Sequence, residues 1–210
     1  ESRPGSLSTL FSTTDFMHDH KLQPGQALIF EGRDCRQTLH LNSIQIVQSN
    51  WLLLGLGDFV VMWNLEKKKA EWIFAKNGIS DFEIPDEQAF ALIHSPTWIA
   101  KSSRLVIFDN GQFKLPPPLF KKPTARILDF KLDTKTKKIL SAKITDLESG
   151  VSEFGGGIDV DGEIVSVALG RHKGAWDVQE IKDGKSTMSF VFGPSEWFYN
   201  YRVYRSSGPQ

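Results

Sequence analysis

The sequence predicts an all-β fold. Short runs rich in β-branched and aromatic residues alternate with turn signals along most of the 210 residues, and no run has the periodicity of a helix of three or more turns. A hairpin pattern of apolar strand, charged tip and second apolar strand recurs, with tips at residues 65–70, 134–138 and 182–185. In the last tip, Asp183-Gly184 supplies the positive backbone angles that a tight hairpin requires.

Overlaying these hairpins divides the chain into similar units. The units run from about 40 to 94, from 94 to 154 and from 154 to about 200, and each has roughly 50 residues, which suits a four-stranded propeller blade. The segment 15–39 has room for two further strands. We therefore expect a β-propeller of about three to four blades over residues 15–205.

The flanking segments have other compositions. Residues 1–14 are rich in Ser, Thr, Gly and Pro and are expected to be a linker or a pairing arm, and residues 206–210 a tail. About three and a half blades would leave exposed strand edges, so we expect a companion chain or an upstream segment to complete the propeller, or the chain to associate with itself.

Composition excludes some partners and structures. The 25 basic and 25 acidic side chains cancel, so no long-range field favours nucleic acid or an anionic membrane. The longest apolar runs, such as 51–56, are far too short to span a bilayer. The single Cys35 cannot form an internal disulfide and is expected to be a buried thiol.

Three histidines precede successive strand-like segments. His20 precedes 27–30, His40 precedes 44–56, and His94 precedes 104–111. A repeated sheet module that carries a polar residue at the same point of each repeat brings those residues together at the shared axis. Three imidazoles and the amide of Asn42 could therefore meet in one pocket, although three histidines could also bind zinc.

Simpler interpretations of the same residues also stand. His94 alone would more often be a strand residue with satisfied hydrogen bonds, and the tryptophans in or beside strands are expected to pack between blades. The run 115–119, Leu-Pro-Pro-Pro-Leu, cannot continue a β-ladder and is expected to form a connecting loop.

Five motifs, in order, resemble those of the arylsulfotransferase family, in its C-terminal part. They are His18-Asp19-His20 before an apolar strand, His40-Leu41-Asn42-Ser43-Ile44-Gln45, His94 ahead of Val106-Ile107-Phe108-Asp109-Asn110-Gly111, the stretch 125–133, and Tyr201-Arg202-Val203-Tyr204-Arg205.

The resemblance implies an aryl-sulfate sulfotransferase-like propeller of the six-bladed type, periplasmic or extracellular. Its reaction would be sulfuryl transfer from a phenolic sulfate ester to a phenol acceptor, without a cofactor or metal. A histidine would carry the sulfuryl group as a sulfohistidine. By position, the resemblance implies that His94 is this nucleophile, and that His40, Asn42, and His20 or His18 donate hydrogen bonds to the sulfuryl oxygens. It places Arg126 and Asn110 in substrate binding.

One departure from the family pattern bears directly on activity. The family carries an arginine on the strand after the His-x-Asn-Ser motif, where this sequence has Leu54-Gly55-Leu56-Gly57-Asp58. Losing one preorganised donor typically costs about 10² to 10³ in rate. The alternative is therefore a noncatalytic propeller that acts as a binding or scaffold subunit of a larger complex.

Overall fold

The computed structural model describes residues 41–76, 79–90, 92–110, 124–147, 152, 155–172 and 175–192. These residues form three four-stranded antiparallel sheets, and helical structure in them is limited to 3-10 turns such as Asp86–Gln88 and Ala100–Ser102. None of the helices in this described part is long and apolar enough to cross a membrane.

Each sheet is built from consecutive strands and is called a blade below. Blade 1 contains β1 (Leu41–Gln48), β2 (Trp51–Leu56), β3 (Phe59–Asn64) and β4 (Lys69–Ala75). Blade 2 contains β5 (Ile93–Ile99), β6 (Arg104–Asp109), β7 (Arg126–Asp133) and β8 (Lys138–Asp146). Blade 3 contains β9 (Gly157–Asp161), β10 (Ile164–His172), β11 (Ala175–Lys182) and β12 (Lys185–Phe192).

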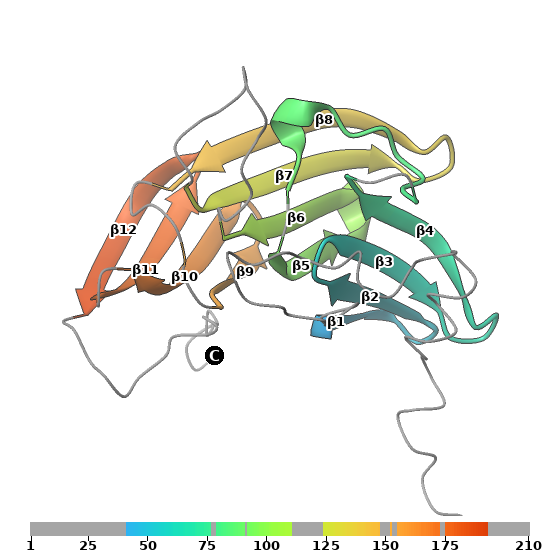
Figure 1. Cartoon of the computed structure of the whole chain (residues 1–210), viewed down its shortest axis with the longest axis horizontal. Coiled ribbons are helices and arrows are strands. Elements are labelled where there is room, and N and C mark those ends of the chain that lie inside the picture. Colours follow the sequence, from blue (N-terminus) through green and yellow to red (C-terminus); the bar gives the residue numbers. More distant parts are fainter. Residues whose placement is uncertain are drawn as a thin grey trace, which may run out of the picture.

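The blades are arranged as in a β-propeller. The first strands β1, β5 and β9 lie on the inner side of an arc, and the last strands β4, β8 and β12 lie on its outer side (Figure 1). Strand β1 contacts β5, and β5 contacts β9, so the inner strands of neighbouring blades adjoin. The described residues thus form three blades of an open arc, which confirms the predicted all-β, partial-propeller fold.

Apolar layers between blades hold the arc together. One buried cluster joins blade 1, through residues such as Leu53 and Phe74, to blade 2, through residues such as Leu105 and Phe130. A second cluster joins the other face of blade 2 to blade 3, for example Phe108 to Val167. At about 25 cal/mol per Å² of apolar surface removed from water, such layers are the main driving force that fixes one blade against the next.

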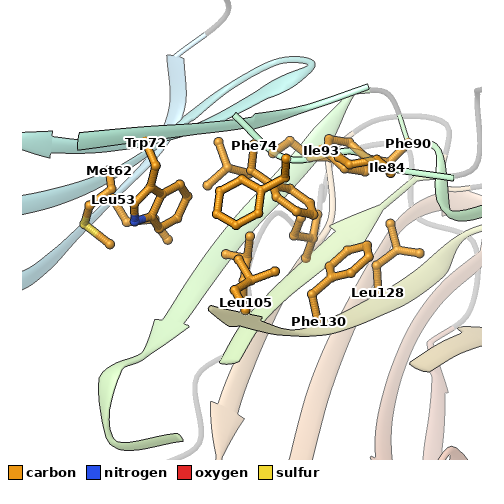
Figure 2. Packing of buried hydrophobic residues seen from close by; sticks show 14 residues of the cluster. Leu53, Met62, Trp72, Phe74, Ile84, Phe90, Ile93, Leu105, Leu128 and Phe130 are labelled. Carbon is orange, nitrogen blue, oxygen red and sulfur yellow. The ribbon is translucent and has the colours of Figure 1, made fainter. Parts of the chain in front are cut away.

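Aromatic rings fill the interface between blades 1 and 2. The Phe74 ring lies 4.8 Å from that of Phe130, 5.3 Å from that of Phe82 and 5.7 Å from that of Phe90, measured between centroids. Phe74 projects from β4 into this group, opposite residues of blade 2 (Figure 2). Such offset and edge-on contacts add to the stabilisation from area burial alone.

The predicted hairpins are confirmed, with one correction to a strand boundary. Turns at 65–68, 134–137 and 183–184 connect β3 to β4, β7 to β8 and β11 to β12. The expected continuous segment 44–56 is instead two strands, β1 and β2, separated by a tight turn at Ser49-Asn50. Both flanking runs are strongly β-forming, so only the two turn residues mark the reversal.

The arc has two ends with different connections. In each described blade, one hairpin joins the first strand to the second and another joins the third to the fourth. Because consecutive strands are antiparallel, these hairpins lie at the same end of the arc, which we call the hairpin end. The turn Gly57-Asp58 between β2 and β3 lies at the opposite end, which we call the linker end. His94 near the start of β5 and Arg126 at the start of β7 lie at the linker end as well.

Candidate functional site at the linker end

Asn42 joins the inner strands of blades 1 and 2. Its side-chain amide donates a hydrogen bond to the carbonyl of Ile93, the residue before His94. The hydroxyl of Ser43 donates to Asn42 Oδ1 at 3.1 Å. The structure therefore brings Asn42 to the strand that carries His94, and it uses the amide of Asn42 to link the two blades.

Gln45 forms a second link of the same kind. Its Nε2 donates to the carbonyl of Trp98 at 3.1 Å, and its Oε1 accepts the Trp98 amide N–H at 2.7 Å. One side chain thus satisfies both backbone groups of a residue on the edge strand β5, where no ladder partner from blade 1 is available. The motif that begins at His40 therefore supplies, through Asn42 and Gln45, the polar contacts between inner strands.

The close approach of these strands depends on Gly55. A Cβ atom at this position would lie 2.3 Å from Ser43 Oγ, 2.8 Å from Asn42 Oδ1 and 3.0 Å from Pro96 Cδ. A larger residue would displace the side chains of Ser43 and Asn42, and with the latter the hydrogen bond to Ile93. Glycine is required here by space, because no positive φ is recorded for this residue.

His94 occupies an irregular part of β5. Its side chain is 7% exposed, and the β5–β6 register shifts between His94 and Thr97. Two non-glycine residues near it have left-handed backbone angles: Leu92 with φ 53° and Ser95 with φ 47°. Ser95 also precedes Pro96, where the α conformations are disfavoured. Strained backbone of this kind is concentrated at functional sites, so this bulge marks the surroundings of His94 as a candidate site.

A charged cluster lies between blades 1 and 2 at this end. Arg126 forms an ion pair with Asp109, and its guanidinium also donates to the carbonyl of Ala89 at 2.7 Å. The side chain of Asp109 is 0% exposed and that of Arg126 is 12% exposed. Burying either charge alone would cost several kcal/mol, so the pair must form for this interface to close.

Asp58 adds a second carboxylate to the cluster. Its Oδ1 accepts the backbone N–H of Leu92 at 2.9 Å, which anchors the turn Gly57-Asp58 to the segment before β5. Burial raises the pKa of the Asp58 carboxyl, the hydrogen bond from Leu92 lowers it, and the negative charge of Asp109 raises it further; the net direction is upward. The cluster therefore holds two carboxylates for one guanidinium.

Strand register separates Arg126 from His94. Ile93, Asp109 and Arg126 are directly paired across β5, β6 and β7, and Ile93 belongs to the cluster shared with blade 1. His94 is paired with Phe108, which belongs to the cluster shared with blade 3. Because paired residues of adjacent strands project from the same face, Arg126 and His94 belong to opposite faces of blade 2.

Asn110, the other residue that the resemblance assigns to substrate binding, follows β6. Its side chain is 2% exposed, and Oδ1 has no hydrogen-bond partner among the described residues. Its backbone carbonyl accepts the N–H of Ser152 at 3.0 Å. A buried acceptor without a donor is costly, so this oxygen is a position where a ligand or water would be stabilised.

The remaining predicted site residues, His18, His20 and His40, lie outside the described residues, as do Cys35 and the run 115–119. In the described ranges, no group of three or more His, Cys, Asp or Glu side chains could hold a metal ion. Gln45 and Asp109 were not predicted to take part in the site, although both belong to the motifs that begin at His40 and Val106.

Comparisons with known proteins find similar folds only. No protein family model matches the sequence, and no curated protein matches it. Solved structures similar to this chain include the Myceliophteria thermophila Cps50 (Swd1) beta-propeller domain, with 10% identity and a TM-score of 0.45 over 73% of this chain and 43% of that chain. Another is the Dos1 propeller, with 11% identity and a TM-score of 0.40 over 69% of this chain and 34% of that chain.

A third similar structure is the acylaminoacyl peptidase of Pyrococcus horikoshii, with 13% identity and a TM-score of 0.32 over 70% of this chain and 32% of that chain. The chain thus spans less than half the length of each of these three proteins. Two of them are described as propellers and none of the three as an arylsulfotransferase. The class of this protein, a segment of a β-propeller, follows from the arrangement of its own three blades.

Proposed function

We propose that this chain is a noncatalytic propeller segment that serves as a binding or scaffold subunit of a larger assembly. The observation that carries the proposal is the ion pair of Arg126 with buried Asp109. Because the family arginine is replaced near Asp58, Arg126 was the residue of this chain expected to supply a positive charge for an anionic donor. Its charge is instead neutralised inside the interface between blades.

The electrostatics of the linker end support this proposal. A sulfate ester is an anion, and the cluster of Asp58, Asp109 and Arg126 carries one negative charge when both carboxylates are ionised. Coulomb repulsion in a partly buried site would weaken the binding of such a donor. Asn42 is also engaged, since its amide donates to the Ile93 carbonyl.

The blade faces at the two ends of the arc support a role in assembly. On β1, the side chains of Ile44 and Ile46 are 50% and 76% exposed, and on β12 those of Met188 and Phe190 are 41% and 51% exposed. In a propeller, such faces are where the next blade packs. They could be covered by a further blade, by a companion chain or by a second copy.

An assay of sulfuryl transfer tests the proposal. The full chain and its His94→Asn variant would be incubated with 4-nitrophenyl sulfate and a phenol acceptor, and release of 4-nitrophenol followed by absorbance. We expect no release above buffer for either protein. Turnover by the parent chain that is lost in His94→Asn would overturn the noncatalytic role.

A second candidate, sulfuryl transfer with His94 as the nucleophile, is favoured by one observation. His94 lies between Leu92 and Ser95, whose left-handed backbone angles bracket it. Strain held around a buried imidazole is a feature of preorganised catalytic groups. In this candidate, His40, Asn42, and His18 or His20 would hold the sulfuryl oxygens, and the outcome of the same assay decides between the two.

A further inference from the structure

A second polar and aromatic site lies at the hairpin end, away from the cluster described above. Here the interface between blades 1 and 2 opens into a pocket with a volume of about 240 Å³. Three indole side chains line it together with Met62: Trp51 at the start of β2, Trp72 in the middle of β4 and Trp98 near the end of β5. Met62 and Trp72 lie at one end of the buried cluster in Figure 2.

The aromatic walls are fixed by their neighbours. The Trp72 and Trp98 rings lie 5.7 Å apart at an angle of 59°, and Trp72 meets Phe82 edge-on at 5.9 Å. Trp72 is 4% exposed, whereas Trp51 and Trp98 are partly exposed. The amine of Lys137 donates to the Glu71 carbonyl at 2.8 Å and lies 5.9 Å from the Phe82 ring centroid, which holds the other wall in place.

The corresponding position between blades 2 and 3 is filled. Arg104, the first residue of β6, stands where Trp51 stands at the start of β2. It binds Asp129 through two hydrogen bonds, at 2.6 and 3.1 Å, and reaches Glu163 at 3.2 Å. The space left there is about 30 Å³. An open pocket is therefore not a necessary consequence of packing one blade on the next.

The size of the pocket limits its occupant. Sites for drug-sized ligands occupy about 300 to 1,000 Å³, whereas an apolar cavity of roughly 150 Å³ holds a benzene molecule. A pocket of about 240 Å³ thus suits one large apolar or aromatic group. Partly exposed indoles and a thioether favour such a group by area burial and ring contacts.

The charge around the pocket is mainly basic. Glu71 in the lining is already paired with Lys67 at 2.9 Å, and this hydrogen bond, with the nearby charges of Lys67 and Lys69, holds the pKa of the Glu71 carboxyl below its usual range although burial opposes it. Exposed Lys101 follows Ala100, and exposed Lys135 follows Thr134; Ala100 and Thr134 both line the pocket. Among the described residues neither lysine forms an ion pair, although the charge of Lys135 acts on the neighbouring Asp133 carboxyl.

We propose that this pocket binds a large apolar side chain of a partner peptide, an anchor residue flanked by acidic residues. The anchor enters between the indoles, and the acidic residues lie against the lysines on the rim. A cationic ligand is disfavoured because Lys101 and Lys135 are next in sequence to the lining residues Ala100 and Thr134, and because Lys69 acts on the lining residue Glu71. The inference rests on the proposed binding role and names a ligand class for it.

Fluorescence anisotropy with the full chain tests the inference. The probe is a fluorescein-labelled peptide with one central phenylalanine between aspartates and glutamates. We expect binding that weakens about tenfold or more when the phenylalanine is replaced by alanine, as the loss of one buried large side chain predicts. Binding should also weaken as NaCl is raised, because rim charges are screened. Equal affinity for the phenylalanine and alanine peptides would overturn the proposal.

Variants separate the pocket from the rest of the surface. Ala100→Trp adds an indole at an exposed lining position and should block binding without removing a packed residue. Lys101→Glu with Lys135→Glu should reduce affinity, whereas Lys185→Glu on blade 3 is the matched control and should not. Unchanged binding in Ala100→Trp refutes the pocket. Turnover in the sulfate assay refutes the noncatalytic role alone, so the two failures are distinguishable.

Discussion

At the scale of single residues, the linker end is held by charges that are costly to bury. Arg126 and Asp109 offset each other, and Arg126 also caps the Ala89 carbonyl. Asp58 forms no ion pair with a described residue: its carboxylate accepts the Leu92 N–H, and its charge is repelled by that of Asp109. Its hydrogen bond therefore stabilises the turn while its ionisation opposes folding, and the two effects can be separated by substitution.

Asp58→Asn is expected to stabilise the chain at neutral pH, and the gain should shrink in acid. Burial, with the repulsion from Asp109, raises the folded-state pKa of Asp58 above its ordinary value. A group with a raised folded pKa contributes stability that is present below its unfolded pKa and is lost as pH rises through the folded pKa. The asparagine oxygen can still accept the Leu92 N–H. Urea unfolding of both proteins at several pH values measures the difference.

Asp133→Asn is the matched control with the opposite sign. The Thr136 hydroxyl and the backbone N–H groups of Thr136 and Lys135 donate to Asp133 and lower its pKa, so its stabilisation is present above the unfolded pKa and is lost as pH falls through the folded pKa. This substitution should therefore destabilise the chain near neutral pH. If Asp58→Asn destabilised the chain equally at neutral and acidic pH, the cost of burying the Asp58 charge, with the smaller repulsion from Asp109, would not control the effect.

At the scale of elements, the sequence predicts the hairpins well because turn chemistry is local. Charged tips such as 134–137, and Asp183-Gly184, determine where strands reverse, and the four-stranded units follow from them. The bulge at His94 is not predictable in this way, since a left-handed Ser95 before Pro96 runs against local preference and is imposed by the contacts of β5 with β1 and β6.

The candidate site shows the same limit. Its residue types were visible in the sequence, but the face on which each lies depends on register, and a shift of one residue moves a side chain to the other face. The pairing of Arg126 with Asp109, and of His94 with Phe108, is set by the ladders of blade 2. The sequence motif therefore predicted that Asn42 and His94 lie on neighbouring inner strands, but not which contacts they make.

Gln45→Leu is expected to loosen the contact between the inner strands. It removes both hydrogen bonds to the Trp98 backbone and leaves a partly buried N–H and C=O without those partners. Each orphaned group costs about 1 to 3 kcal/mol, so we expect a loss of about 2 kcal/mol or more in the free energy of unfolding. Urea denaturation followed by tryptophan fluorescence measures this loss.

Gln48→Leu provides the comparison for that substitution. Gln48 lies on the same strand, is exposed, and its side chain forms no hydrogen bond within the described part of the chain, so stability should change by less than about 0.5 kcal/mol. Equal effects of Gln45→Leu and Gln48→Leu would show that the Gln45 bridge does not hold blade 1 on blade 2.

At the scale of the whole molecule, three blades form an arc whose end faces differ from its packed interfaces. Ile44 is paired with Leu54 and Ile46 with Leu52, so both isoleucines continue the apolar face of blade 1 that points away from blade 2. Leu54 is 1% exposed, whereas the two isoleucines on the inner strand remain open to solvent. Exposed apolar residues that extend a packed face mark a site of association.

We therefore expect the full chain to associate, with itself or with a companion segment, through this face of blade 1. Replacing Ile44 and Ile46 together by lysine places two charges where a second blade would pack, and burying an unpaired charge is strongly unfavourable. In light scattering coupled to size-exclusion chromatography, the molar mass of the parent chain should rise with concentration, and that of the double variant should stay at the mass of one chain, 23.7 kDa.

Leu140→Lys is the control, because Leu140 is 57% exposed on the outer strand β8, away from the face of blade 1. A parent chain that remains a single copy at every concentration, and that captures no further propeller segment when one is supplied, would contradict association through the end of the arc.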